Sequence, residues 1–411
     1  MRLIQWMILG LPWVILYGVR EGLHLPKEAV LQTGGLAIIL VSLFQGRIIL
    51  PFRSVWLQRL FLWVLLQSAV IFWWPLLTLK PTSNLEFVAF HVWMTLLDVL
   101  IAGLLIWVLS SVYLPRMDCW VRISQWLCWS AMAVAAYALC QYLGFDQLLG
   151  RFHNVNHPDV QPYAKMLAGL GHHAYVAMYL SLILPLFLAI QGWRYIGGFC
   201  LVLLAIGLSH VHYVWVATIL SLLTYALFWS WQQFPRARRL LPYFTLILCG
   251  IGLLVAWQHR SLLLQDERWV IWQVSFDHLR LQHLTGFGLG NFETAFSINW
   301  VKLKEITPAL VGHTQPWKWM HNDLLQWVYE TGFIGGGLLL LAMSEGARNL
   351  WQRIHLPASP KSTLAIAWAA SAISLLLLSL TNFPWHLAPC AWVGILIVAV
   401  CLAPEPQGGS A

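Results

Sequence analysis

Long apolar runs recur along this chain, and they restrict its fold more than any other feature. Each run is about 17–25 residues long, which is the length that an α-helix needs to cross the hydrocarbon core of a bilayer. Lipid offers no hydrogen-bond partners, so such a run must satisfy its own backbone groups and therefore forms a helix. Hydrophobic residues make up 59% of the 411 positions and charged residues only 10%. We therefore predict an all-α polytopic integral membrane protein.

The apolar runs predict twelve membrane spans, at residues 3–19, 29–45, 55–74, 88–113, 124–144, 172–190, 194–208, 212–230, 240–257, 322–343, 362–381 and 386–403. The first run has no small-residue cleavage site before Arg20, so we interpret it as an uncleaved span rather than a signal peptide. The chain then divides into nine N-terminal spans (1–257), a large polar loop with an amphipathic helix (258–321), three C-terminal spans (322–403) and a tail predicted to be disordered (404–411).

Basic residues in short loops predict the orientation of the chain, because they accumulate on the cytoplasmic side. One set of loops carries Arg47, Arg53, Arg59, Arg116, Arg122, Arg194, Arg236, Arg238, Arg239, Arg348, Arg353 and Lys361, and the opposite set carries only Arg20, Lys27 and Lys80. Both termini are therefore predicted to be cytoplasmic, and the long loops at 145–171 and 258–321 face outside. The net charge of +8 is spread over many loops, which argues against a nucleic-acid partner.

The spacing of cysteines and histidines does not favour a metal site. The seven cysteines are scattered and form no CxxC pair, so neither a disulfide framework nor a cysteine-based metal site is expected. Four histidines lie in or after the first long loop, at His153, His157, His172 and His173, and their spacing fits no common zinc pattern. We predict no metal and no cofactor.

The stretch HNDLLQWVYETGFIGGG, residues 321–337, places polar groups at the start of an apolar span. Such groups are costly in hydrocarbon unless they are paired or face water. At helical spacing, His321, Gly332 and Gly335 fall along one stripe, and the two glycines allow another backbone to approach closely. The simpler interpretation is a capped helix start followed by packing glycines. That interpretation leaves His321 and Glu330 unexplained.

The second long loop contains DERWVIWQVSFDHLRLQHLTGFGLGNFE at 266–293. Arg268, Trp272 and Phe276 recur at helical spacing, which is typical of an amphipathic helix at a membrane surface. The planar guanidinium of Arg268 can hold a phosphate through paired hydrogen bonds, although an arginine that extends toward lipid head groups gives the same pattern. The GFGLGN string has no strand–turn–helix context and faces outside, so dinucleotide binding is excluded.

Taken together, residues 265–340 resemble the O-antigen ligase and polymerase superfamily of bacterial envelope glycosyltransferases. That family shows an Arg-x-x-x-aromatic helix and a GxGxxNF-like turn. After these come His-Asn, nine intervening residues and then Gly-x-x-Gly. The corresponding residues here are Arg268 to Trp272, GFGLGNF at 286–292, and His321-Asn322 followed by Gly332 and Gly335. The chain departs from the family earlier, where Lys165 replaces an expected Arg and His172-His173 stand in place of Pro-Asn.

The resemblance implies a metal-independent, inverting transferase in the bacterial inner membrane. It would move a glycan from a polyprenyl-diphosphate carrier to an acceptor hydroxyl at the periplasmic face. Arg268 and His321 are the implied catalytic residues. The expected substrate-binding residues are Arg151, Lys165, Asn322, Glu330, His173 and Asn291, and the structural glycines are Gly286, Gly288, Gly332 and Gly335. The acceptor stays open between lipid A–core, another carrier-linked glycan and a protein hydroxyl.

A solute transporter is the alternative from a different class. It would explain the number of spans, but transporters place ionisable residues near the middle of the bilayer. Asp98 and Glu330 are the clearest such residues in this chain, and no convincing internal repeat is present. A structural scaffold is the third alternative, and it leaves His321 and Arg268 without a role.

Overall fold

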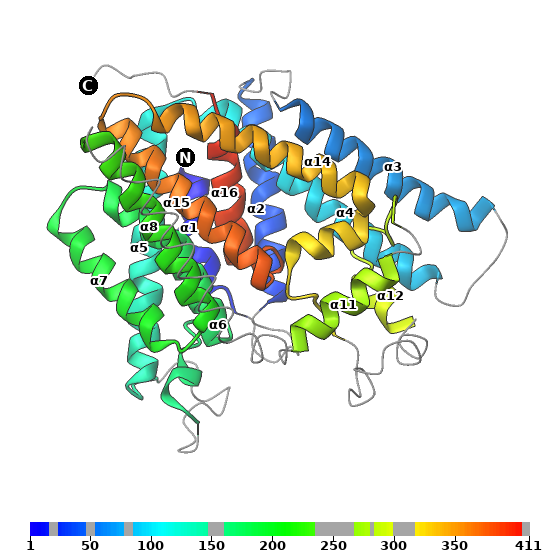
Figure 1. Cartoon of the computed structure of the whole chain (residues 1–411), viewed down its shortest axis with the longest axis horizontal. Coiled ribbons are helices and arrows are strands. Elements are labelled where there is room, and N and C mark those ends of the chain that lie inside the picture. Colours follow the sequence, from blue (N-terminus) through cyan, green and yellow to red (C-terminus); the bar gives the residue numbers. More distant parts are fainter. Residues whose placement is uncertain are drawn as a thin grey trace.

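The computed structural model describes residues 1–15, 24–46, 54–77, 85–146, 160–234, 267–279, 283–298 and 317–404; of residues 71–91 and 93 in these ranges only the backbone is described. Within these ranges the chain is helical with short connections and no strand (Figure 1). The predicted all-α fold class is therefore confirmed for the described part of the chain. The predicted disordered tail lies almost entirely outside it.

The helical elements, including short 3₁₀ or π segments labelled η, follow one another along the chain with these bounds. They are α1 (Arg2–Gly10), η1 (Leu11–Trp13), α2 (Leu25–Phe44), α3 (Val55–Leu77), α4 (Leu85–Val108), η2 (Leu109–Tyr113), α5 (Met117–Tyr142), η3 (Pro162–Lys165), α6 (His173–Ile183), η4 (Leu184–Ala189), α7 (Trp193–Leu208), α8 (His212–Gln233), α11 (Glu267–Leu279), α12 (Phe292–Ile298), α14 (Asp323–Ile354), α15 (Pro360–Thr381), η6 (Pro384–His386) and α16 (Ala388–Leu402).

Six of the described helical segments are long and apolar enough to cross a membrane. They are Leu25–Phe44, Met94–Tyr113, Met117–Tyr142, His212–Gln233, Asp323–Ile354 and Pro360–Thr381. Shorter apolar helices occur at Val55–Val70, His173–Ala189, Trp193–Leu208 and Ala388–Leu402. The fold is that of a helical membrane protein, and the predicted total of twelve spans stays a prediction. The predicted span at 240–257 lies outside the described residues.

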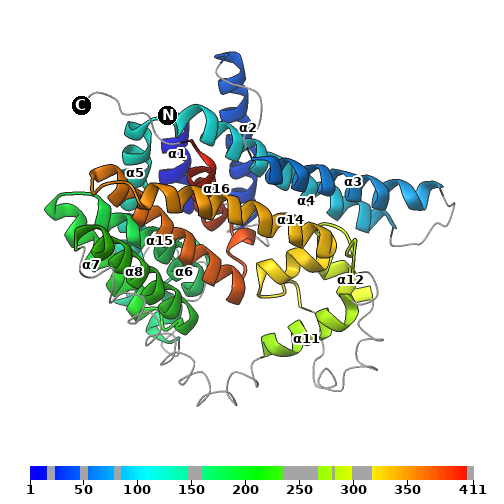
Figure 2. The ribbon, with the colours of Figure 1, turned by 45° about the horizontal axis from the view of Figure 1, so that its top comes forward.

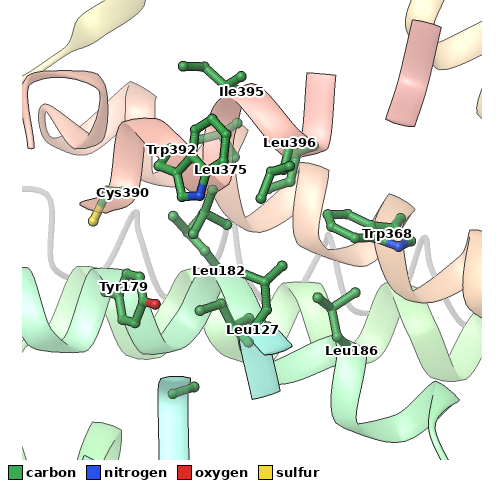
Figure 3. Close-up of a cluster of buried hydrophobic side chains, with 14 of the residues drawn as sticks. Leu127, Tyr179, Leu182, Leu186, Trp368, Leu375, Cys390, Trp392, Ile395 and Leu396 are labelled. Atoms are coloured by element: carbon green, nitrogen blue, oxygen red, sulfur yellow. The ribbon is translucent and has the colours of Figure 1, made fainter. Parts of the chain in front are cut away.

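The core lies where α5, α6, α15 and α16 meet, and it is built from large apolar side chains. Trp368 of α15 and Trp392 of α16 are each 1% exposed, and they pack with Leu182 and Leu127 (Figure 3). The outer face of α3, in contrast, carries exposed apolar side chains, which are Leu62 and its apolar neighbours. A buried core beneath an apolar outer surface is typical of a bundle that faces lipid.

Small polar side chains connect the central helices. Ser181 of α6 and Ser374 of α15 share a hydrogen bond of 2.8 Å, and Thr218 of α8 donates to Ser181 at 2.9 Å. Ser221 of α8 donates to the Ala370 carbonyl at 2.6 Å. Hydrogen bonds of this kind between helices help to fix their packing where lipid supplies no competing partner.

The elements that carry the sequence motifs gather at one part of the molecule. Helices α11 and α12 lie beside the first half of α14 in both ribbon views (Figures 1 and 2), and contacts join each of them to α14. Helices α3 and α4 pair and extend along the same side, with α3 packed on α14. The start of α14 therefore stands between helices α11 and α12 and the main bundle.

Candidate functional site

Helix α14 is interrupted at Gly332, where φ is 72° and ψ is −179°. At this break the backbone N–H groups leave the helical pattern. The N–H of Phe333 donates to the His283 carbonyl at 2.9 Å, and that of Ile334 donates to the Leu284 carbonyl at 3.4 Å. A break inside a membrane helix is tolerated only when such groups find other partners. The residues just before the glycine-rich loop supply them here.

The carbonyl groups released by the break are satisfied by the same loop. The N–H of Phe287 donates to the Tyr329 carbonyl at 3.0 Å, and the N–H of Gly288 donates to the Glu330 carbonyl at 2.8 Å. Gln67 of α3 also donates to the Glu330 carbonyl, at 2.7 Å. The glycine-rich loop and the break in α14 are therefore two halves of one hydrogen-bonded unit.

The motif glycines allow the backbone conformations and close approach that this hydrogen-bonded unit requires. Gly286 and Gly288 have φ values of 69° and 98°, in the region that favours glycine. A Cβ on Gly286 would overlap the backbone of Gly332 and Glu330. The close backbone approach expected at Gly332 is therefore present. At Gly335 the atoms nearest to an added Cβ belong to the side chains of Thr331 and Trp63.

Two of the predicted substrate-binding residues lie inside the same unit. Glu330 is 5% exposed, and its carboxylate accepts from the Gly290 N–H at 2.7 Å and from Gln326 Nε2 at 3.0 Å. Asn291 is 2% exposed and donates to the Phe287 carbonyl at 3.2 Å. Both side chains hold the loop in place and neither lies at the exposed surface.

Helix α11 docks on this unit through its buried face. Ile271 and Val274 are buried there, and His278 shares a hydrogen bond of 2.8 Å with the Tyr329 hydroxyl. Burial lowers the pKa of His278 from its usual 6.5. The rings of Phe287 and Tyr329 stack with their centroids 4.7 Å apart. The exposed face of α11, on the opposite side, carries Trp269 and Phe276.

Arg268 extends from the first turn of α11 to the end of α15. Its Nη1 donates to the Thr381 carbonyl at 3.1 Å, and its guanidinium lies 4.9 Å from the ring centroid of Tyr213. A cation over an aromatic face is attracted by the ring, so the guanidinium is oriented from two directions. The residue is half-buried. Through these two contacts Arg268 connects α11 to α15 and α8, in addition to any role toward lipid.

His321 lies just before Asn322, the N-cap of α14, and faces the same part of the bundle. The preceding carbonyl, of Met320, accepts from Trp272 Nε1 at 2.9 Å, which links His321 to α11. The imidazole meets the ring of Phe383 edge to face at 5.0 Å. Its φ of 54° is in the left-handed region, where a residue other than glycine is strained, and such strain clusters at functional sites. Arg268 and His321 are therefore brought against one segment, residues 381–383.

Asn322 is the N-cap of α14, in agreement with the interpretation of this stretch as a capped helix start. Its side chain accepts from the Leu325 N–H at 2.9 Å, which satisfies one of the free donors at the start of α14. Asn322 is half-buried. Its contact to the helix fixes the direction in which the chain enters α14 from His321.

Histidines of the earlier loop form an aromatic surface that continues to this site. The ring of His173 lies 5.3 Å from Tyr163 and 4.1 Å from His172. Tyr175 lies 5.2 Å from His172 and 5.9 Å from Phe383, which also contacts His321. A chain of ring contacts thus joins the two predicted histidine regions.

Lys165 ends η3, only two residues after Tyr163, and is half-buried. It therefore lies beside the Tyr163 end of this aromatic surface. The other predicted second cation, Arg151, lies outside the described residues. Among the described residues, no group of three or more His, Cys, Asp or Glu side chains could hold a metal ion.

Sequence reasoning missed the side chains that hold the start of α14 against the α15–α16 connection. His386 Nδ1 lies 2.9 Å from Asp323 Oδ1, and His386 Nε2 lies 3.3 Å from Gln326 Nε2. The available signal was a histidine in NFPWHLAP, where every residue after Asn382 except the histidine is apolar. Its partner, one residue after the capping Asn322, could not be identified without the fold.

Comparison with known proteins adds no assignment. No family model matches the chain, and no curated protein matches it either.

Proposed function

We propose that the protein is a membrane glycosyltransferase of the O-antigen ligase type. It transfers a glycan from a polyprenyl-diphosphate carrier to an acceptor hydroxyl at the periplasmic face of the inner membrane. One observation carries the proposal. Arg268 and His321 come from separate parts of the chain, and both lie against the segment at 381–383, through the Thr381 carbonyl and the Phe383 ring.

The transfer needs a fixed cation and a base or orienting group, which are the residue types that meet at the segment 381–383. The leaving group is a diphosphate that already carries negative charge, so fixed cations stabilise its departure. Arg268 supplies a planar set of donors that can hold phosphate oxygens. The acceptor hydroxyl needs a base or an orienting group near neutral pH, and an imidazole is suited to both roles. His321 takes this role, and direct displacement inverts the anomeric carbon.

The remaining predicted residues take supporting roles. The aromatic surface at Tyr163 and His173 offers ring faces and imidazole hydrogen bonds to sugars, and Lys165 adds a cation there. Asn322 orients the entry to α14. Glu330 and Asn291 shape the site indirectly, because their side chains hold the glycine-rich loop. The acceptor class distinguishes a ligase from a polymerase or a protein glycosyltransferase, and these stay alternatives within the proposal.

A proton-coupled solute transporter is the second candidate, and one observation favours it. Asp98 lies in the apolar segment Met94–Tyr113 and accepts from Gln32 Nε2 at 2.6 Å. Ionisable side chains within apolar membrane segments are typical of proton and substrate pathways.

Purified protein in lipid vesicles separates the two functions. A carrier-linked glycan is supplied with lipid A–core, with a second carrier-linked glycan, or with a hydroxyl-bearing protein, and the product is measured by mass spectrometry. We expect one acceptor to be glycosylated, with transfer lost in His321→Ala and kept in His355→Ala, a histidine at the far end of α14. Absence of transfer to all three acceptors, together with proton-dependent solute uptake that requires Asp98, would replace the transferase with the transporter.

A further inference from the structure

The connection between α15 and α16 touches both residues of the proposed site. This connecting segment, Thr381–Leu387, presents its first carbonyl to Arg268 and the ring of Phe383 to His321. Two residues that act on one substrate must keep a fixed separation. The position of the connecting segment therefore sets how Arg268 and His321 stand relative to each other.

Asp323 fastens this segment to the start of α14 through three contacts. Its Oδ1 accepts from His386 Nδ1 at 2.9 Å, and its Oδ2 accepts from the Trp385 backbone N–H at 3.1 Å. Its own N–H donates to the Asn382 carbonyl at 3.2 Å. Asp323 is 7% exposed. A negative charge in the first turn of α14 is also favoured by the helix dipole. Both carboxylate oxygens are thus used to hold the connecting segment.

The hydrogen bonds around Gln326 fix which nitrogen of His386 carries the proton. The Met320 N–H donates to Gln326 Oε1 at 3.2 Å, so Gln326 Nε2 is the donor of that amide. This Nε2 faces Glu330 Oε1 at 3.0 Å and His386 Nε2 at 3.3 Å. His386 Nε2 therefore accepts, and Nδ1 carries the proton that is donated to Asp323. His386 is held at both nitrogens, so its imidazole is a structural connector here.

We propose that Asp323 and His386 are a pair of positioning residues that hold the connecting segment so that Arg268 and His321 face the same substrate. This inference rests on the proposed function for its catalytic consequence, and on the contacts above for its geometry. Displacement of a reacting group by about 1 Å can cost about 100-fold in rate. Loss of the pair is therefore expected to lower kcat far more than it changes KM.

Isosteric variants of His386 test which nitrogen matters. The side-chain nitrogen of Asn takes the place of Nδ1 and can still donate to Asp323, whereas that of Gln takes the place of Nε2 and cannot. We expect His386→Asn to keep kcat within about threefold and His386→Gln to fall about 100-fold, as far as His386→Ala. Asp323→Asn replaces one acceptor oxygen with a donor that faces another donor, so it is expected to fall as well. His355→Ala is the matched control, because His355 is an exposed histidine bonded to the Trp351 carbonyl at the other end of α14.

Hydrogen–deuterium exchange in lipid nanodiscs supplies a readout that does not depend on activity. Peptides that cover the connecting segment report the exchange rate of the Trp385 N–H, which donates a hydrogen bond to Asp323. We expect faster exchange there in His386→Ala, His386→Gln and Asp323→Asn, and near wild-type exchange in His386→Asn. Peptides from the core of α15 serve as the internal standard for a folded bundle.

The outcomes separate this inference from the proposed function. Unchanged exchange in His386→Ala would overturn the positioning pair, whatever the activity. Faster exchange with normal transfer would overturn its catalytic consequence while the proposed function stands. Equal loss of rate in His386→Asn and His386→Gln would also overturn the catalytic consequence. Such a result would show that the Nδ1 hydrogen bond to Asp323 does not set the rate. If wild-type protein transfers no glycan but exchange follows the expected order, the proposed function fails and the geometric part of the inference holds.

Discussion

Gly332 and Leu284 approach so closely that a Cβ on Gly332 would overlap the Leu284 carbonyl. The φ and ψ angles of Gly332, 72° and −179°, lie in a region that only glycine populates readily. We expect Gly332→Ala to lower the free energy of unfolding by about 1–3 kcal/mol or more, from backbone strain alone. Gly337→Ala is the matched control, because nothing lies within 4 Å of a Cβ at that position. Thermal unfolding in detergent measures both, and equal midpoints for the two variants would contradict the role given to the break.

Arg268→Lys tests how the proposed cation works. Lysine keeps the charge but lacks the planar set of donors that gives two parallel hydrogen bonds to a phosphate. If Arg268 clamps the diphosphate, transfer should fall about tenfold or more at matched expression. Arg348→Lys, an exposed arginine near the other end of α14, is the control. Near wild-type rates for Arg268→Lys would show that charge alone suffices, as expected of an arginine that only meets lipid head groups.

Substitutions at His321 distinguish a base from an orienting group. A positioned general base contributes about 10²–10⁴-fold, so His321→Ala should reduce transfer by about that factor. Glutamine keeps a hydrogen-bonding group but cannot take a proton. If His321 is the base, His321→Gln should be nearly as poor as His321→Ala, and if it only orients the acceptor, Gln should recover much of the rate. Normal transfer by both purified variants would remove His321 from the site.

The docking of α11 should weaken in mild acid because of His278. Burial lowers the pKa of His278 below 6.5 in the folded protein, so the folded state favours the neutral imidazole. The stabilisation is complete above about pH 6.5 and is lost as pH falls toward the lowered pKa. Exchange rates of peptides from Glu267–Leu279, corrected for intrinsic pH effects, should rise between pH 7.5 and 5.5. His278→Asn, which does not titrate, should remove this dependence, and its persistence in that variant would assign it to another group.

Thiol labelling tests the predicted sidedness. Ser297 in α12 and Ala358 in the α14–α15 connection are both exposed, and the sequence places them on opposite sides of the membrane. Each is replaced by Cys in a protein whose exposed Cys140 and Cys200 are changed to Ser. In intact spheroplasts, an impermeant thiol reagent should label the Cys at 297 and leave the one at 358 unlabelled. Equal labelling would place the proposed site in the wrong compartment.

Several helix boundaries could be predicted from the sequence, because local chemistry sets them. The predicted span at 194–208 corresponds to α7 at Trp193–Leu208, and the one at 362–381 corresponds to α15 at Pro360–Thr381. Ser359 begins α15 through a capping box, with proline in the first helical position. Signals of this kind lie within a few residues of the boundary, so no knowledge of the tertiary fold is needed to read them.

Helix α14 continues to Ile354, eleven residues beyond the end of the predicted membrane span at 322–343. The sequence turns polar there, and polar residues normally mark the end of a span. Tertiary contacts allow the helix to continue. Glu345 accepts from Ser54 at 2.6 Å, and the buried Arg353 donates to the Val400 carbonyl at 2.6 Å. Partners that lie far away in the chain thus decide how far a polar helix extends.

The sequence by itself determined that the chain forms membrane helices, because hydrocarbon leaves the backbone of a long apolar run no other way to satisfy its hydrogen bonds. It also indicated Arg268 and His321 as residues that packing alone does not explain. Only the tertiary structure decided that α14 breaks at Gly332, because the break requires carbonyl and N–H partners from the loop at 283–288. The same holds for the meeting of Arg268, His321 and the Asp323–His386 pair at one connection. Contacts between segments so far apart depend on how whole helices pack, which no local pattern encodes.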